Sequence, residues 1–570
     1  MVESQLFRQV LTVLLLASAL IAGGRSHAQE RFFVETVQVH VVNVDVIVTD
    51  RRGRPATGLT REDFELLEDG APVAITNFYA GSGRARAEEE EMVPAGVPED
   101  QRLHLVIVLD LAASRPFDRN AAITHLQNLV QEVLDPSARV MVATLDRSLK
   151  MRSRMTGDRD EVTTALERIR GEAGEGVATD AQRRMLLRAM EHTQFAGDSR
   201  QAISRDREFY EEDARSQLQS IHGMAEWERT QALGTLGALE RLSQSLAGIP
   251  GRKVMLYVGD GLSARPGEAL FQAWQNKFFD LARDWGISAA LEASRYELER
   301  PLRDMVDRAN TSRVSFYTLE PGGGQPTTAL GAERGGGVWA PELEAMETMS
   351  RQQSLMALTS GTGGRSLAGG VDGPSGLSAF EDELEGFYSL GFSPEGDGPN
   401  RYRSLRVRVK DDSLRVRHRE GYRRRSTEEQ MQDRTVAALV HGAVDNTLGV
   451  AIAPQSPTRR SDGNYSVRVM VQVPLGNVVF LPGSAAHTGR LIIYLAVEDD
   501  RGRTSPVERR EFPISIPNDH ILTALGQFAG FTFDMNLRRG PHRVAVTVQD
   551  ELGGVVATTT RPLLVGDSER

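Results

Sequence analysis

Two apolar runs in the first half of the chain have the pattern of strands buried on both faces. Residues 104–109 form the first run, which ends at Asp110, and residues 253–258 form the second, which is followed by Gly259 and Asp260. Runs of this kind, without polar alternation, indicate central strands of a parallel sheet. Because ligands of open α/β sheets bind beyond the carboxyl ends of the strands, Asp110 lies where a site is expected.

Helical and β-rich segments alternate around these two runs. The pattern predicts helices over 120–134 and 160–170, and further strands over 140–145 and 314–319. Such alternation implies right-handed crossovers and therefore a doubly wound, mostly parallel α/β sheet. Residues 181–248 have apolar positions at helical spacing and are longer than one crossover needs. Two interpretations of this insertion stay open: helices that pack on the sheet and on each other, or an excursion that presents a partner surface.

Alternation with a period of two marks both ends of the chain. Valines from Val37 to Val48 and the strands that follow predict an N-terminal β region, too short to be a stable two-layer domain alone. The Arg-striped segments 405–410 and 414–419 predict a hairpin that packs on this region. Beyond residue 447, β-rich runs separated by Gly and Pro predict a C-terminal antiparallel sandwich.

Turn and helix-capping residues mark the boundaries between these regions. Ser426 and Glu429 form a capping box that opens a linker helix. Acidic turns with glycine follow the strands that end near Asp50 and Asp499, and they lack the alternating ligands of a calcium loop, which favours plain turns. The expected segments are a signal peptide 1–28, an N-terminal β region 30–80, a linker 81–101, an α/β domain 102–384 with its helical insertion 181–248, a β-hairpin region 385–425, a linker helix 426–446 and a C-terminal β-sandwich 447–570.

Composition narrows the function classes. The 570 residues carry a formal net charge of −11 and include no cysteine. The absence of cysteine excludes disulfides, thiolate metal sites and a cysteine nucleophile. The acidic balance gives no reason to expect a nucleic-acid partner.

The N-terminus has the pattern of a secretion signal. Arg8 precedes an apolar core over 10–22, and Ser26-His27-Ala28 is a small-x-small cleavage site. The apolar core is shorter than the roughly 20 residues of a membrane span. We therefore expect an exported protein, periplasmic or extracellular, with no stable membrane span after cleavage; an uncleaved anchor is the alternative.

Catalytic motifs are not apparent. Neither His-Glu-x-x-His nor Gly-x-Ser-x-Gly occurs, and His104 and His192 fit a strand start and a helix surface better than a catalytic role. The expectation is a non-catalytic interaction module that binds an exported protein or a cell-surface component. Because triads assemble from distant positions, a secreted hydrolase with a non-motif active site is the alternative.

The two strand ends resemble the metal-site loops of a von Willebrand factor type A domain. In that family Asp-x-Ser-x-Ser follows the first strand and Asp-Gly follows the fourth; here the loops read Asp110-Leu111-Ala112-Ala113-Ser114 and Asp260-Gly261. The wider order of motifs resembles the bacterial VWFA-related Acidobacterial-type domain family over about residues 35–425. The segments that carry this resemblance are 44–50, 58–64, 68–70, 314–317, 362–365, 388–394 and 419–422. The resemblance implies export, a type A core and an interaction function, and it names no substrate.

The resemblance also implies a degenerate metal site. Asp110, Ser114 and Asp260 match family positions, and Thr179 matches a Thr of a middle loop, whereas Ala112 replaces a hydroxyl ligand. A hard cation needs a near-complete set of oxygen ligands. We therefore expect no cofactor and no tight metal binding, with only weak Mg²⁺ binding if water fills the vacancy. Alternatively, the two aspartates accept backbone N–H bonds.

Overall fold

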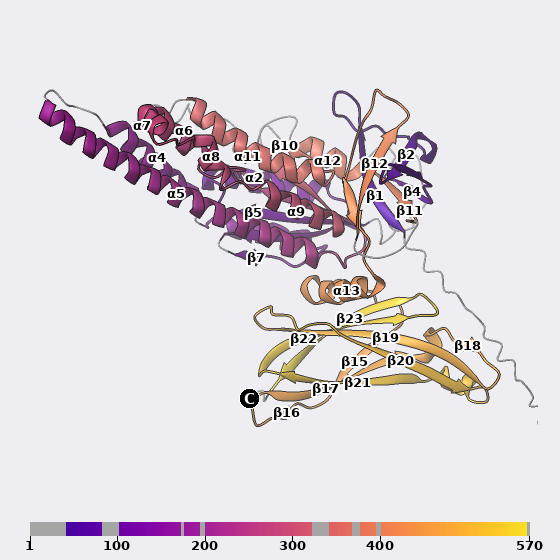
Figure 1. Ribbon diagram of the computed structural model, residues 1–570. Helices are drawn as coiled ribbons and strands as arrows, with labels where there is room; N and C mark the ends of the chain where they lie inside the picture. The colour runs from indigo at the N-terminus through magenta and orange to yellow at the C-terminus, as the bar shows by residue number, and fades with distance from the viewer. Residues whose placement is uncertain are drawn as a thin grey trace, which may run out of the picture. The chain divides into compact units, whose positions relative to one another are not determined.

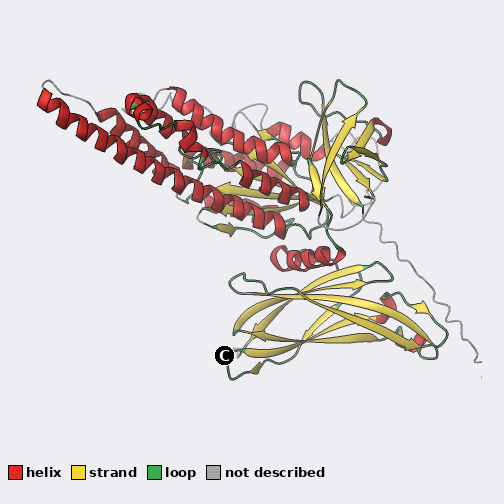
Figure 2. Ribbon diagram, in the orientation of Figure 1, coloured by secondary structure: helices red, strands yellow, loops and turns green. Residues whose placement is uncertain are grey.

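The computed structural model describes residues 41–81, 102–146, 148–172, 176–193, 200–321, 341–367, 377–394 and 401–566. The expected signal peptide and nearly all of the expected linker 81–101 lie outside these residues. Within the described residues the protein is mixed α/β, with one six-stranded sheet that contains parallel strands and four antiparallel sheets (Figures 1 and 2). The expected α/β class is thus confirmed at this level. No helix of the described part is long and apolar enough to cross a bilayer.

The six-stranded sheet has the order β10-β9-β8-β5-β6-β7. Its strands are β5 (Leu103–Asp110), β6 (Arg139–Leu145), β7 (Leu149–Met151), β8 (Arg252–Val258), β9 (Val314–Leu319) and β10 (Ser366–Leu367). All neighbours pair in parallel except β7, which is an antiparallel edge strand. Numbered along the chain within this sheet, the order is 6-5-4-1-2-3, so the strand order reverses between β5 and β8.

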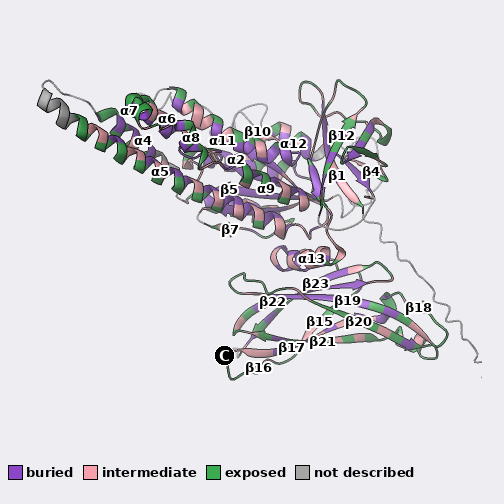
Figure 3. Cartoon of the chain, viewed as in Figure 1, coloured by how far each residue is buried: buried purple, intermediate pink, exposed green. Residues whose placement is uncertain are grey.

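Helices cover both faces of this sheet, which explains why residues 105–109 of β5 are all apolar. On one face Leu105, Ile107 and Leu109 pack with helices α2 (Pro116–Asn128), α3 (Arg159–Ile169) and α12 (Leu377–Glu385). On the other face Val106 and Val108 pack with α5 (Arg200–Ser245), α9 (Glu299–Thr311) and α11 (Pro341–Gly361). These strand residues are fully buried (Figure 3). Burial on both faces is typical of parallel strands.

The predicted helical insertion consists of α4 (Gly176–His192) and the 46-residue helix α5. The last turns of α5 pack on the sheet, and its middle packs with α4, α6 (Glu268–Lys277), α7 (Phe279–Asp284) and α8 (Ala289–Ser294) around Trp274 and Phe271. The indole N–H of Trp274 donates to the carbonyl oxygen of Ala214 on α5 at 2.8 Å. The insertion therefore shares a hydrophobic core with α6, α7 and α8, beside the core of the sheet.

The N-terminal strands pair with strands more than 300 residues later. One sheet has the order β13-β1-β11-β4 and the other β14-β12-β2-β3, and the two share one hydrophobic core. The strands are β1 (Val42–Thr49), β2 (Phe64–Glu68), β3 (Ala71–Val73), β4 (Asn77–Ala80), β11 (Tyr388–Phe392), β12 (Tyr402–Val409), β13 (Arg415–His418) and β14 (Gly421–Arg423). The 385–425 region and the N-terminal region thus contribute strands to the same two sheets, which together form an N-terminal sandwich.

The expected hairpin between residues 405–410 and 414–419 is wrong. β12 pairs with β2 and β14, whereas β13 pairs with β1 in the opposite sheet. Both segments alternate Arg with apolar residues, and that alternation shows which face is buried without showing which strand is the neighbour. The turn at Asp411 therefore crosses between the two sheets.

A buried ionic cluster joins this sandwich to the amino ends of β8 and β9. Arg313 pairs with Asp45 of β1 at 2.7 Å, and Arg419 donates to the carbonyl oxygens of Asn43 and Asn310, both at 2.8 Å. The ammonium group of Lys253 donates to the carbonyl oxygen of Ile249 at 2.8 Å. Burial, together with the positive charge of Arg313, lowers the pKa of Lys253 to about 7.

The C-terminal region is a second sandwich. Its strands are β15 (Ala451–Pro454), β16 (Thr458–Arg459), β17 (Tyr465–Pro474), β18 (Leu481–Pro482), β19 (Ala486–Asp499), β20 (Glu508–Pro517), β21 (Phe528–Leu537), β22 (Gly540–Asp550) and β23 (Val556–Val565). They form two antiparallel sheets around one core.

The acidic turns take the same form at Asp50 and Asp499. Each carboxylate accepts the backbone N–H groups of the residues two and four positions later, and the glycine at the fourth turn position has a positive φ. The prediction of turns is confirmed there.

Helix α13 (Thr427–His441) begins with the predicted capping box of Ser426 and Glu429. Its contacts are more extensive than the expected linker role implies. Ala437 belongs to the core beneath α5, while Ala438 and Leu439 pack against the outer face of β19 and β22. The sequence marked the start of this helix but not the two surfaces that it contacts.

The turn before β10 gives a test of packing. A Cβ atom on Gly364 would lie 1.7 Å from the carbonyl oxygen of Phe316, whereas one on Gly234, inside α5, would meet nothing within 4 Å. We expect Gly364→Ala to lower the free energy of unfolding by about 3 kcal/mol or more, because the backbone of β9 must move. Gly234→Ala should raise it by about 1 kcal/mol through helix propensity. Equal effects of the two substitutions in urea unfolding would contradict this packing.

Lys253 gives a test by pH. Its pKa is about 7 in the folded protein and roughly 10.4 in the unfolded chain. Between these values the unfolded chain binds one more proton, so the free energy of unfolding should rise with pH over this window. Lys253→Met should flatten this rise in urea titrations from pH 6.5 to 9.5. An unchanged slope in the variant would show that Lys253 is not the group responsible.

Candidate functional site

The candidate site lies at the carboxyl ends of β5 and β8, where the strand order reverses. The two loops that follow these strands are joined directly, because the backbone N–H of Asp260 donates to the carbonyl oxygen of Ala113 at 2.6 Å. In open α/β sheets the crevice at such a reversal is the usual ligand site. The strand order thus brings together two loops that are about 150 residues apart in the sequence.

The carboxylate of Asp110 organises the first loop. One oxygen accepts the backbone N–H groups of Ala112 and Ala113 at 3.0 and 2.9 Å, and the other accepts the hydroxyl of Tyr257 at 2.5 Å. Burial raises the pKa of Asp110, against the effect of these three donors. The pKa of the Tyr257 hydroxyl lies well above its ordinary value because the group is buried beside this carboxylate. Both carboxylate oxygens of Asp110 therefore accept hydrogen bonds from groups of the protein.

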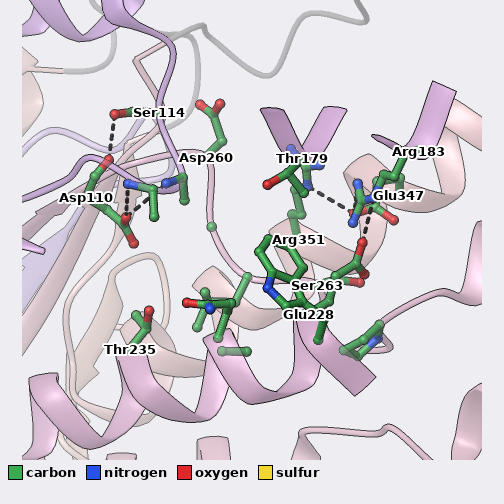
Figure 4. Close-up of a pocket in the computed structure, with 18 of the residues that line it drawn as sticks. Asp110, Ser114, Thr179, Arg183, Glu228, Thr235, Asp260, Ser263, Glu347 and Arg351 are labelled. Carbon is green, nitrogen blue, oxygen red and sulfur yellow. Dashed lines mark hydrogen bonds and ion pairs between the residues drawn. The ribbon is translucent and has the colours of Figure 1, made fainter. Parts of the chain in front are cut away.

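A cavity opens beside this loop, with a volume of about 870 Å³ including its mouth. Asp110, Ser114, Asp260 and Thr179 all line it, so the structure brings the four predicted residues to one cavity (Figure 4). Ser114 is buried and its hydroxyl donates to the carbonyl oxygen of Asp110 at 2.5 Å. Thr179 was expected in a loop, but it lies in the first turn of α4, because the helical insertion already begins at Gly176.

An ionic network that the sequence analysis missed forms the opposite wall. Arg183 of α4 pairs with Glu228 of α5 at 2.7 Å and with Glu347 of α11 at 2.8 Å, and Arg351 pairs with Glu347 at 3.1 Å (Figure 4). Glu228 also accepts the backbone N–H of Gly267 at 3.2 Å. Burial opposes the charged form of Glu347, but the two arginines outweigh it and hold its pKa below the usual value. The network ties three helices together around the cavity.

Only one part of this network has a local sequence signal. Glu347 and Arg351 are four residues apart on one helix, which is the spacing of an intrahelical ion pair. Arg183, Glu228 and Glu347 are separated by 45 and more residues, so nothing in the sequence links them. Their meeting depends on how α4, α5 and α11 pack.

The donor groups around Asp110 do not fit a directly bound divalent cation. Both carboxylate oxygens of Asp110 already accept protein donors, the hydroxyl of Ser114 donates to a carbonyl group, and Ala112 presents a methyl group. Among the residues that the structure describes, no group of three or more His, Asp or Glu side chains could hold a metal ion. With Ala112 in place of a hydroxyl residue, a directly bound hard cation would find an incomplete set of protein oxygen ligands here.

The two histidines considered in the sequence lie away from the cavity. His104 is buried near the start of β5, at the opposite end of the strand from Asp110, and burial together with the charge of Lys253 lowers its pKa to about 3. His192 is exposed at the end of α4. None of the described residues that line the cavity is a histidine.

The ionic wall yields a stability test. Glu347→Gln should lower the free energy of unfolding by about 3 kcal/mol, because it leaves the buried Arg183 and the half-buried Arg351 without their shared carboxylate. The matched control is Glu299→Gln, which removes an exposed pair with Arg303 and should cost no more than about 0.5 kcal/mol. Urea unfolding monitored by circular dichroism measures both. A loss as small as that of the control would contradict a structural role for the network.

The metal expectation has a direct test by calorimetry. We expect no tight binding of Mg²⁺ or Mn²⁺ to the natural chain, and partial recovery of binding in Ala112→Ser, which restores a hydroxyl in the first loop. Micromolar binding by the natural chain that disappears in Asp110→Ala would contradict this expectation.

Comparisons with known proteins add little to this geometry. No family model and no curated protein matches the chain. Among solved structures, proximal thread matrix protein 1 from the mussel byssus, whose structure has a zinc-occupied MIDAS motif, is 8% identical over 52% of this chain and 48% of its own, with a TM-score of 0.20. A β-glucuronidase from Bacteroides uniformis is 8% identical over 32% of this chain and 19% of its own, with a TM-score of 0.15. At these TM-scores neither likeness carries an argument about fold or function.

Proposed function

We propose that the protein is an exported interaction module with a von Willebrand factor type A core, and that it binds its partner at the cavity beside Asp110 and Asp260. The partner is an exported protein or a cell-surface component. The observation that carries the proposal is the position of the cavity: it lies where the strand order reverses, between the loops after β5 and β8.

Several features support the type A assignment. Counted from the β7 edge, the strands follow the order 3-2-1-4-5-6, with helices on both faces and one antiparallel edge strand. This is the order of a doubly wound sheet. The motif residues Asp110, Ser114 and Asp260 stand at the two strand ends that the resemblance predicts. Export is supported by the apolar segment 10–22 and by the cleavage pattern before Gln29.

The cavity supports binding better than hydrolysis. A Ser–His pair finds no support, since none of the described lining residues is a histidine. The carboxylate of Asp110 is held by three donors, and Glu228 and Glu347 are held by arginines, so these groups serve the wall itself. Groups already committed to structural contacts are poorly placed to transfer protons to a substrate.

Site-specific photo-crosslinking tests the proposal. Gln231 lines the cavity and is exposed, whereas Ser220 is an exposed residue of the same helix that does not line it. We expect a benzophenone amino acid at position 231 to give a discrete adduct with envelope material of the native cells, and the same group at position 220 to give none. Identical adducts from both positions, or none from position 231, would contradict binding at the cavity.

A further inference from the structure

We infer that the cavity receives a neutral sugar ring of a glycan. This inference rests on the proposed function and names the chemistry that the same site recognises. It depends on three features of the lining: its charged groups already interact with the protein, several of its neutral polar groups do not, and it includes an exposed tryptophan.

The charged side chains of the lining are committed to contacts within the protein. Four carboxylates and three guanidinium groups line the cavity. The two glutamates and two of the arginines pair with one another at 2.7 to 3.1 Å. Both oxygens of Asp110 accept hydrogen bonds, and Asp260 and Arg115 each have an interaction of their own. Because an ion is costly to desolvate without a counter-charge, the site favours an uncharged ligand.

Neutral polar groups of the lining can still bind a ligand. Within the part of the chain that the structure describes, four such groups make no hydrogen bond to the protein: the hydroxyl groups of Thr179 and Thr235, the amide group of Gln231 and the indole N–H of Trp227. Hydroxyl and amide groups both donate and accept hydrogen bonds. A ligand that satisfies them carries several groups that also do both, as the hydroxyl groups of a sugar do.

Three of these residues form a row on α5. Trp227, Gln231 and Thr235 are spaced four residues apart, so they lie on one face of the helix. At 1.5 Å per residue the row spans about 12 Å along the helix axis. Exposure falls along it, because Trp227 is 40% exposed and Thr235 only 9%. The row therefore runs from the mouth of the cavity toward its interior, with an aromatic ring at the outer end.

Trp227 supplies the surface that distinguishes a sugar from other neutral ligands. An indole ring is a large apolar surface that proteins usually bury, and here it is left partly exposed at a cavity wall. A sugar ring has an apolar face of C–H groups and a rim of hydroxyl groups. It can lie flat against the indole ring while its rim bonds to Gln231 and Thr235. Small-ligand sites typically combine an aromatic surface with a few placed polar groups in this way.

The test is binding of the full chain to an array of neutral oligosaccharides built from hexoses, N-acetylhexosamines and pentoses, in the presence of EDTA. Calorimetry follows with the sugar that binds best and with its monodeoxy analogues. We expect at least one neutral sugar to bind. At least one analogue should lose about tenfold or more in affinity, because a site built to bond a hydroxyl group discriminates against a ligand that lacks it.

Variants assign the binding to the row on α5. Trp227→Leu should lower the affinity about tenfold or more, because it removes the stacking surface. Gln231→Leu and Thr235→Val should each lower it about fivefold, the effect of one neutral hydrogen bond. The matched controls are Gln219→Leu and Thr230→Val, at exposed positions of the same helix that do not line the cavity, and they should leave the affinity unchanged. Thermal unfolding verifies that each variant is folded.

The outcomes separate this inference from the proposed function. Random octapeptides are screened beside the sugars. Peptides whose binding depends on Trp227, with no neutral sugar bound, would overturn the inference and leave the binding function standing. Sugars that bind only when they carry a carboxylate or sulfate group, or only without EDTA, would overturn the inference as well. Selection of no sugar and no peptide whose binding responds to Trp227→Leu or Gln231→Leu would overturn both.

Discussion

The burial of a carboxylate at the end of a fully buried strand is the constraint on which the site depends. Asp110 follows five apolar residues that are covered on both faces, so its charge cannot reach bulk water. A buried carboxylate is tolerated only where donors surround it. Tyr257 and the backbone N–H groups of Ala112 and Ala113 supply those donors, and in doing so they determine the path of the first loop. The loop then holds Asp260 beside it through a backbone hydrogen bond.

Buried charges are also matched by partners on the far wall of the cavity. Arg183 is largely buried, and it is stable there because Glu228 and Glu347 both face it. Three helices from distant parts of the chain must therefore pack together for the charges to be matched. The insertion of α4 and α5 thus does more than extend the domain, because it supplies most of one side of the cavity.

The regions that flank the sheet are connected to it by buried polar and apolar contacts. Asp45 of the first strand pairs with Arg313, which directly precedes β9, and Arg419 donates to backbone carbonyl groups of β1 and of α9. Helix α13 contacts α5 on one side and the C-terminal sandwich on the other. Because a buried charge without its partner is costly, the N-terminal sandwich and the sheet stabilise each other. This explains how a chain segment too short to form a domain alone is nevertheless ordered.

The sequence by itself determined the features that depend on local periodicity. The apolar runs predicted the central strands, the spacing of Ser426 and Glu429 predicted the start of α13, and Asp50 and Asp499 predicted their turns. Each of these depends on residues within a few positions of each other, so their physical cause is contained in a short window. The same holds for the strand ends at Asp110 and Asp260, which marked one side of the candidate site.

Only the tertiary structure decided which of these elements meet. The alternating pattern of residues 405–419 fits a hairpin as well as two strands of opposite sheets, since both bury the same face. Thr179 took a place in a helix where a loop was expected, and the wall of Arg183, Glu228 and Glu347 left no trace in the sequence. Their contacts span 45 residues and more, and their energy depends on burial and on matched charge. Side-chain burial and the pairing of these charges arise only when the helices pack together.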